Sequence, residues 1–131
     1  MPVSMETRTE LDLTIFTVSG MITVDEQKQK LKAFYEGSPT RNVIWDFSLM
    51  EEVSASAEDL RDIILYAKQF AGKRPGGRTA LIVNTKLKYG LARMASSFAE
   101  IEEIPWTIMA FEQPDEALSW IAQGTESETP S

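Results

Sequence analysis

The apolar residues of the chain follow two different spacings, which alternate along the sequence. Short runs rich in β-branched and aromatic residues are typical of strands, whereas apolar residues that recur every three or four positions are typical of amphipathic helices. The first pattern predicts strands at residues 11–19, 43–47, 80–83 and 105–111. Helical stripes lie between and after these strands, and the most regular stripe begins at Leu60.

Residues that favour helix starts stand before the helical stripes. Thr23 and Ser56 each stand three residues before an acid, as N-cap residues often do. Asn84 or Thr85 can cap the third helix, and Gly124 is expected to end the fourth.

Strands and helices in alternation predict an α/β fold. We expect a single domain with a four- to five-stranded, mostly parallel sheet, about four helices and right-handed crossovers, because 131 residues suit one such domain. Its predicted bounds are residues 10–123. Residues 1–9 are expected to be an N-terminal extension or a short edge strand, and residues 124–131 a disordered acidic tail.

Composition narrows the possible chemistry. The chain has no Cys and no His, so thiol nucleophiles, imidazole bases and the metal sites that these residues build are excluded. We expect no cofactor, no metal and no enzymatic role, because the adjacent acids Glu51 and Glu52 lack a converging base or nucleophile.

The net charge and the apolar runs of the chain indicate which partners and which cellular location to expect. The net charge of −7 makes nucleic acid an unexpected partner. Most of the basic residues in the acid-free segment 63–99 are expected on solvated surface. No apolar run approaches the roughly 20 residues of a membrane span, and no secretory signal is visible, so we expect a cytoplasmic location.

Polar residues gather where two predicted strands end. Asp46 stands at the end of one strand and Asn84 at the end of another, with Lys86 and Lys88 close behind. Ligands of open α/β sheets bind at the carboxyl ends of the strands. We therefore define a carboxyl-end rim, formed by residues 46–56 with Asn84, Lys86 and Lys88, as the candidate binding site. The plainer interpretation of Asp46 is a carboxylate that accepts hydrogen bonds from turn amides.

The order of the predicted elements, with serines near this rim, is similar to that of a known protein family. One predicted strand ends in Val-Ser-Gly and another in Trp-Asp-Phe, and a serine-bearing turn then opens a helix. This order resembles the STAS domain of anti-sigma-factor antagonists and sulphate transporters, and most closely the small stand-alone bacterial STAS-like proteins. In antagonists, a strand-end aspartate, which Asp46 matches, precedes a turn of the type Asp-Ser-Ser-Gly-Leu, and a partner kinase phosphorylates one serine.

The resemblance implies a possible phosphosite at Ser56 or Ser54. Residues 54–57 read Ser-Ala-Ser-Ala, so the aspartate and the glycine of the motif are absent. A phosphate at a helix N-terminus would meet free amides, although the acids nearby would repel it. The plainer interpretation of Ser56 is a helix cap.

These observations favour a non-enzymatic, STAS-like regulatory or binding domain. We expect it to recognise a protein partner or a small anionic ligand at the carboxyl-end rim. An alternative is a carrier of a lipid or another apolar small molecule, because STAS-like folds resemble one class of lipid-transfer domain. That role requires a cavity of roughly 300 Å³ or more between helices and sheet. A third hypothesis is a homodimeric scaffold.

Overall fold

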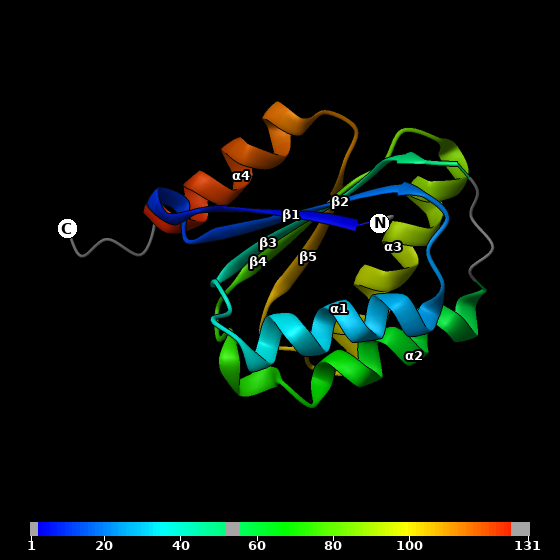
Figure 1. The fold of residues 1–131 in the computed structure, drawn as a ribbon, viewed down its shortest axis with the longest axis horizontal. Coiled ribbons are helices and arrows are strands. Elements are labelled where there is room, and N and C mark those ends of the chain that lie inside the picture. Colours follow the sequence, from blue (N-terminus) through cyan, green and yellow to red (C-terminus); the bar gives the residue numbers. More distant parts are fainter. Residues whose placement is uncertain (1–2, 52–55, 127–131) are drawn as a thin grey trace.

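A central five-stranded sheet separates three helices on one face from a single helix on the other (Figure 1). The computed structural model describes residues 3–51 and 56–126, with the backbone alone for residues 125 and 126. The elements are β1 (Val3–Arg8), η1 (Thr9–Leu11), β2 (Leu13–Gly20), α1 (Val24–Glu36), β3 (Asn42–Met50), α2 (Ala57–Lys68), η2 (Ala71–Lys73), β4 (Arg78–Ile82), α3 (Lys86–Ile101), β5 (Thr107–Phe111) and α4 (Pro114–Glu126). The predicted α/β class is confirmed.

The order of the strands explains how the helices are distributed. The sheet order β1-β2-β3-β4-β5 follows the sequence; β1 pairs antiparallel with β2, and every later pair is parallel. Right-handed crossovers that always step in the same direction leave their helices on the same face. Consequently α1, α2 and α3 cover one face, and α4 alone packs on the other (Figure 1).

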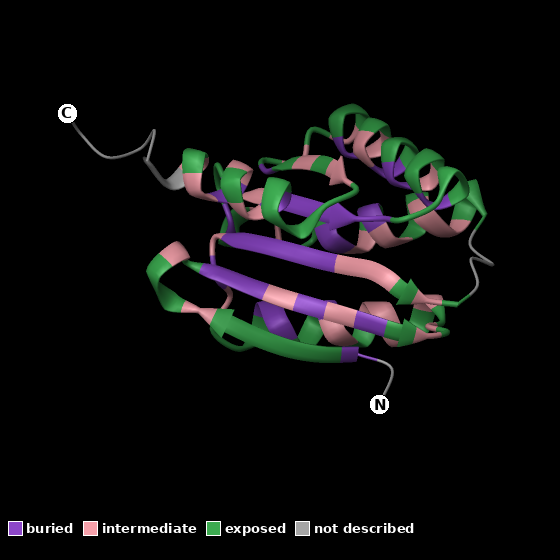
Figure 2. Cartoon of the chain, turned by 90° about the horizontal axis from the view of Figure 1, so that it is seen from above, coloured by how far each residue is buried: buried purple, intermediate pink, exposed green. Residues whose placement is uncertain are grey.

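Alternate strand residues supply two apolar cores, one on each face of the sheet. The larger core lies under α1, α2 and α3 and is rich in aromatic residues, with the rings of Phe16 and Trp45 stacked at 4.4 Å between centroids. The buried residues of the smaller core, under α4, are Leu13, Ile44, Ala80, Ile82, Ala117 and Ile121. Burial is concentrated on the central strands, while β1 at the edge is largely exposed (Figure 2).

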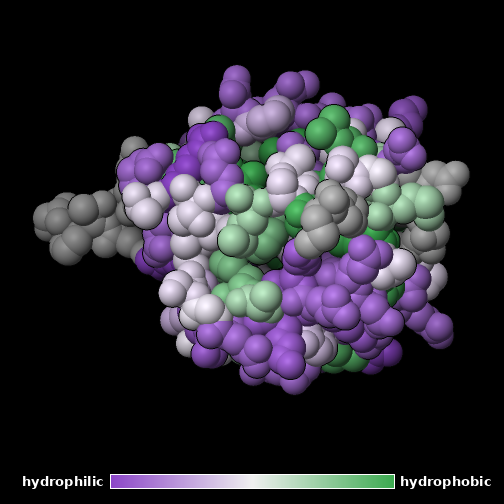
Figure 3. Space-filling view, in the orientation of Figure 1, coloured by the Kyte–Doolittle hydropathy of each residue, from purple (hydrophilic) through white to green (hydrophobic). Residues whose placement is uncertain are grey.

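Helix α1 shows how local sequence sets an element and its orientation. Thr23 caps it as predicted: Thr23 Oγ1 accepts from the Glu26 amide, and Glu26 Oε1 accepts from the Thr23 amide, each at 3.1 Å. Leu31, Phe34 and Tyr35 face the sheet and are buried. The opposite face carries lysines, and Figure 3 shows a largely hydrophilic outer surface there.

Strand β3 is longer than the predicted strand 43–47. Thr17 pairs with Asp46 and Ser19 pairs with Leu49. These two pairs are three residues apart in β3 but two residues apart in β2, so β3 contains a β-bulge. After the bulge, β3 continues to pair with β2 up to Met50. The prediction that this strand ends at residue 47 was therefore wrong, because a bulge leaves no mark in the apolar periodicity.

Two other predicted boundaries also differ from the structure. Leu11, the predicted start of β2, lies instead in the short 3₁₀ helix η1, and Asp12 follows it in the left-handed region with φ 48°. Gly124 does not end α4, which continues to Glu126. A side chain at Gly124 would collide with the side chain of Arg78, so this glycine permits close packing inside the helix.

Candidate functional site

The carboxyl-end rim is built around the bulge in β3. Asp46 lies just before the bulge, and its Oδ1 accepts from the backbone amide of Ser48 at 2.9 Å and from the Ser48 hydroxyl at 2.6 Å. This is the plainer role expected of Asp46, a carboxylate that satisfies local donors. It holds the bulged backbone of residues 46–48 in place.

Asn84 and Lys88 meet the same segment from the neighbouring strand and helix. Asn84 Nδ2 donates to the carbonyl of Ser48 at 2.9 Å. Lys88 is only 7% exposed, and its ammonium donates to the carbonyls of Phe47 and Met50 at 3.0 and 2.7 Å and to Asn84 Oδ1 at 3.0 Å. Because an ammonium has three protons, this network uses all of them. Lys88 therefore joins α3 to the end of β3.

The remaining predicted rim residues differ in their surroundings. Lys86 is exposed, and no hydrogen bond or ion pair to its ammonium is found among residues 3–51 and 56–126. Ser56 caps α2: its hydroxyl accepts from the Asp59 amide at 3.1 Å, and Asp59 Oδ2 accepts from the Ser56 amide at 3.0 Å. Thr85, rather than Asn84, caps α3. Ser54 lies outside the described residues.

Apolar side chains are exposed around this polar network. Met21, which follows β2, is 54% exposed, and Leu49 near the end of β3 is 61% exposed. Leu87 in the first turn of α3 is 62% exposed. The rim thus combines internally satisfied polar groups with apolar groups that face solvent.

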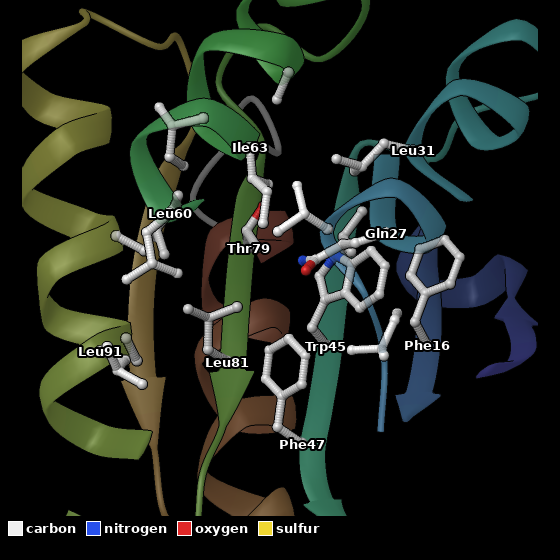
Figure 4. A pocket seen from close by; sticks show the side chains of 18 of the residues that line it. Phe16, Gln27, Leu31, Trp45, Phe47, Leu60, Ile63, Thr79, Leu81 and Leu91 are labelled. Carbon is white, nitrogen blue, oxygen red and sulfur yellow. The ribbon is translucent and has the colours of Figure 1, made fainter. Parts of the chain in front are cut away.

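A cavity of about 360 Å³ lies between the sheet and the three helices that cover it (Figure 4). Its walls are largely apolar, and Gln27 directs its side-chain amide into it. One end lies beside the exposed residues Met21 and Thr23, and the other is lined by buried residues that include Tyr35 and Arg74. Labelled wall residues are Phe16, Leu31, Trp45, Phe47, Leu60, Ile63, Thr79, Leu81 and Leu91.

Arg74 dominates the buried end of this cavity. It is 2% exposed, so the expectation of solvated surface is wrong for this residue. Its guanidinium lies 4.9 Å from the ring centroid of Trp106. It donates four hydrogen bonds of 2.8 to 3.2 Å, to the carbonyls of Arg41 and Arg78, the hydroxyl of Tyr35 and the hydroxyl of Thr79.

Burial perturbs both titratable groups at this end. Desolvation lowers the pKa of the Arg74 guanidinium, against the opposing influence of the Tyr35 hydroxyl and of Asp12. Desolvation likewise raises the pKa of Tyr35, and the nearby positive charge of Arg74 counteracts part of the rise. The sequence did not predict these two residues as site residues, because Tyr35 fits an apolar helical stripe and Arg74 stands in a loop with other basic residues.

Metal binding and membrane crossing find no support in the described part of the chain. No group of three or more Asp and Glu residues within it is arranged to hold a metal ion. None of its helices combines the length and the apolar character needed to cross a membrane.

Comparisons with known proteins assign the fold. No protein-family model matches the chain, and no curated protein matches it by sequence. The sheet order and the arrangement of helices define a STAS-like α/β domain. Among solved structures, the chain is similar to the anti-sigma factor antagonist SpoIIAA in its unphosphorylated form, with a TM-score of 0.54 and 16% sequence identity. The match covers 92% of this chain and 97% of that chain, and at this identity the likeness is one of fold.

Proposed function

We propose that the chain is a STAS-like regulatory domain that binds a protein partner at its carboxyl-end rim. One observation carries the proposal: the rim's polar side chains are largely hydrogen-bonded within the chain, while Met21, Leu49 and Leu87 expose apolar surface around them. Exposed apolar groups surrounded by polar ones are typical of protein-binding surfaces.

The rim geometry favours a protein over a small anionic ligand. Lys88 has no free proton to offer an anion, which leaves Lys86 as the exposed cation of the predicted set. An anti-sigma factor antagonist acts, as its name says, on another protein. A chain of the same fold with an apolar rim is well suited to the same kind of partner.

Site-specific photo-cross-linking in native cells tests this proposal. A photoreactive phenylalanine analogue at Leu87 should capture a discrete partner, because this side chain is 62% exposed at the rim. Ile101 is the matched control, since it is 72% exposed at the opposite end of α3. Capture of the same partner with equal yield from Ile101 would contradict recognition at the rim.

A second candidate function is the binding of an apolar small molecule in the core. The cavity of about 360 Å³ favours it, because it exceeds the roughly 300 Å³ from which ligand pockets typically start. A solvatochromic neutral dye such as Nile red would report on binding. Ala92→Phe and Ala95→Phe add volume to the cavity wall and should abolish the signal while the circular dichroism spectrum is retained. A wild-type protein that leaves the dye unchanged would contradict this function.

Phosphorylation at Ser56 or Ser54 stays a prediction of the family resemblance. A phosphate on Ser56 would replace the hydroxyl that caps α2 and would lie close to Glu58 and Asp59. Intact-mass measurement and phosphosite mapping of the protein from native cells test it, and an unmodified protein under all growth conditions would count against it.

A further inference from the structure

The buried end of the cavity has the chemistry of an anion-binding subsite. We propose that the cavity takes an elongated apolar molecule with one carboxylate head, such as a long-chain fatty acid, and that Arg74, Tyr35 and Thr79 bind the head. This inference rests on the second candidate function above, the binding of an apolar small molecule. These three residues form the head-group subsite.

The head-group subsite has more donors than acceptors. A guanidinium carries five N–H groups, and Arg74 uses four of them in the hydrogen bonds described above. The remaining N–H, on Nη1, has no acceptor within the described part of the chain. The hydroxyls of Tyr35 and Thr79 both accept from Arg74, which cannot accept in return. Each hydroxyl therefore keeps a proton that no described residue accepts.

The charge at this end is compensated only from a distance. The carboxylate of Asp12 acts on Arg74 electrostatically, but Asp12 is exposed. Among the ion pairs of the described residues, none involves Arg74, so its neighbours are carbonyls, hydroxyls and the Trp106 ring. A buried charge without a direct ion-pair partner is costly, and an anion placed beside it recovers part of that cost. A carboxylate has only acceptor atoms, so it suits a site that offers a positive charge and spare donors.

The rest of the cavity suits an apolar tail and fixes its direction. From the buried end, the walls follow β3 from Val43 to Met50, a span of roughly 23 Å at about 3.3 Å per residue. Lys88 also lines the cavity near its exposed end, but its three protons are taken by Phe47, Met50 and Asn84. The carboxylate is therefore expected at Arg74, with the tail directed toward Met21.

Competition between matched ligands tests the head-group subsite. Palmitate and hexadecanol each have 16 carbons and differ in the charge of the head, and each is titrated against protein loaded with Nile red. Palmitate should displace the dye at a concentration at least tenfold lower than hexadecanol. Tyr35→Phe should weaken palmitate binding about tenfold and leave hexadecanol unchanged, because it removes one hydrogen bond to a charged group. Tyr66→Phe is the control, since Tyr66 packs against the same core but does not line the cavity.

A spectroscopic measurement on the wild-type protein keeps the test valid should Tyr35→Phe fail to fold. Palmitate labelled with carbon-13 at the carbon next to the carboxylate should show NMR contacts to the Trp106 ring. Equal displacement by palmitate and hexadecanol, or contacts from the label to Met21, would overturn the head-group subsite and leave apolar-ligand binding intact. Failure of both ligands to displace the dye would overturn the subsite as well, and failure of the dye itself to bind would overturn apolar-ligand binding.

Discussion

Arg74 joins segments that lie far apart in the sequence. Its guanidinium reaches the carbonyl of Arg41 before β3, Tyr35 in α1 and Thr79 in β4. The geometry ties the ends of three elements to one side chain. Removing the guanidinium would leave two partly buried carbonyls and two buried hydroxyls without this donor, and unsatisfied buried polar groups are costly.

Arg74→Met is expected to lower the free energy of unfolding by about 3 kcal/mol or more, because two buried hydroxyls and two partly buried carbonyls lose their donor together. Urea denaturation followed by circular dichroism measures the change. Lys73→Met is the control, as Lys73 is exposed and its substitution should stay within about 0.5 kcal/mol. Equal stability of the two variants would show that the Arg74 network is unimportant.

Tyr35 should give the stability a dependence on alkaline pH. Its pKa is raised in the folded state, so the folded protein holds the phenolic proton more tightly than the unfolded chain does. The resulting stabilisation is fully present below the unfolded-state pKa of about 10 and is lost as the pH rises through the folded-state pKa. Urea denaturation at several alkaline pH values should show this loss in the wild type and a smaller one in Tyr35→Phe. Parallel curves would contradict the assignment.

At the scale of elements, regular sequence patterns predict helices and strands. Single irregular features, such as a bulge, have no such pattern and are not predicted. Apolar periodicity located the four helices and the central strands, and acids three residues after Thr23 and Ser56 located two helix starts. The bulge after Asp46 and the role of Gly124 depend on neighbouring elements, so no local sequence pattern predicts them. The cavity depends on how three helices pack, which residue spacing does not specify.

Ser56 provides an element-scale test of its capping role. Ser56→Ala should lower the free energy of unfolding by about 1 kcal/mol, because it removes the acceptor for the Asp59 amide at the start of α2. Ser56→Asp should retain most of the stability, as aspartate also caps helices. Ser97→Ala in the exposed face of α3 is the control and should be neutral or slightly stabilising in thermal denaturation. A neutral Ser56→Ala would contradict the capping role.

Two glycines before β4, Gly77 and Gly72, allow a similar comparison between a crowded position and an open one. A side chain at Gly77 would collide with the carbonyl of Arg41, whereas one at Gly72 would meet open space. Gly77→Ala should therefore cost about 1 to 3 kcal/mol, and Gly72→Ala should be neutral or stabilising by a few tenths. Chemical denaturation of both variants measures the difference, and a tolerated Gly77→Ala would show that this loop can move away from β3.

At the scale of the whole molecule, the one-directional strand order accounts for both candidate sites. It places three helices on one face, where the cavity lies, and it brings the ends of β2 and β3 and the start of α3 to one rim (Figure 1). The predicted domain bounds, residues 10–123, stay a prediction, and the homodimeric scaffold stays a hypothesis. Sedimentation equilibrium would measure the oligomeric state directly.

Recognition of a protein at the carboxyl-end rim is the central claim, and quantitative co-purification from native cells tests it most directly. Tagged wild type, Leu87→Lys and Ile101→Lys are compared by mass spectrometry, since both residues are exposed on α3 and lie at its opposite ends. One partner should be retained by wild type and Ile101→Lys and reduced at least tenfold with Leu87→Lys. A partner retained equally by all three proteins, or lost only with Ile101→Lys, would contradict it.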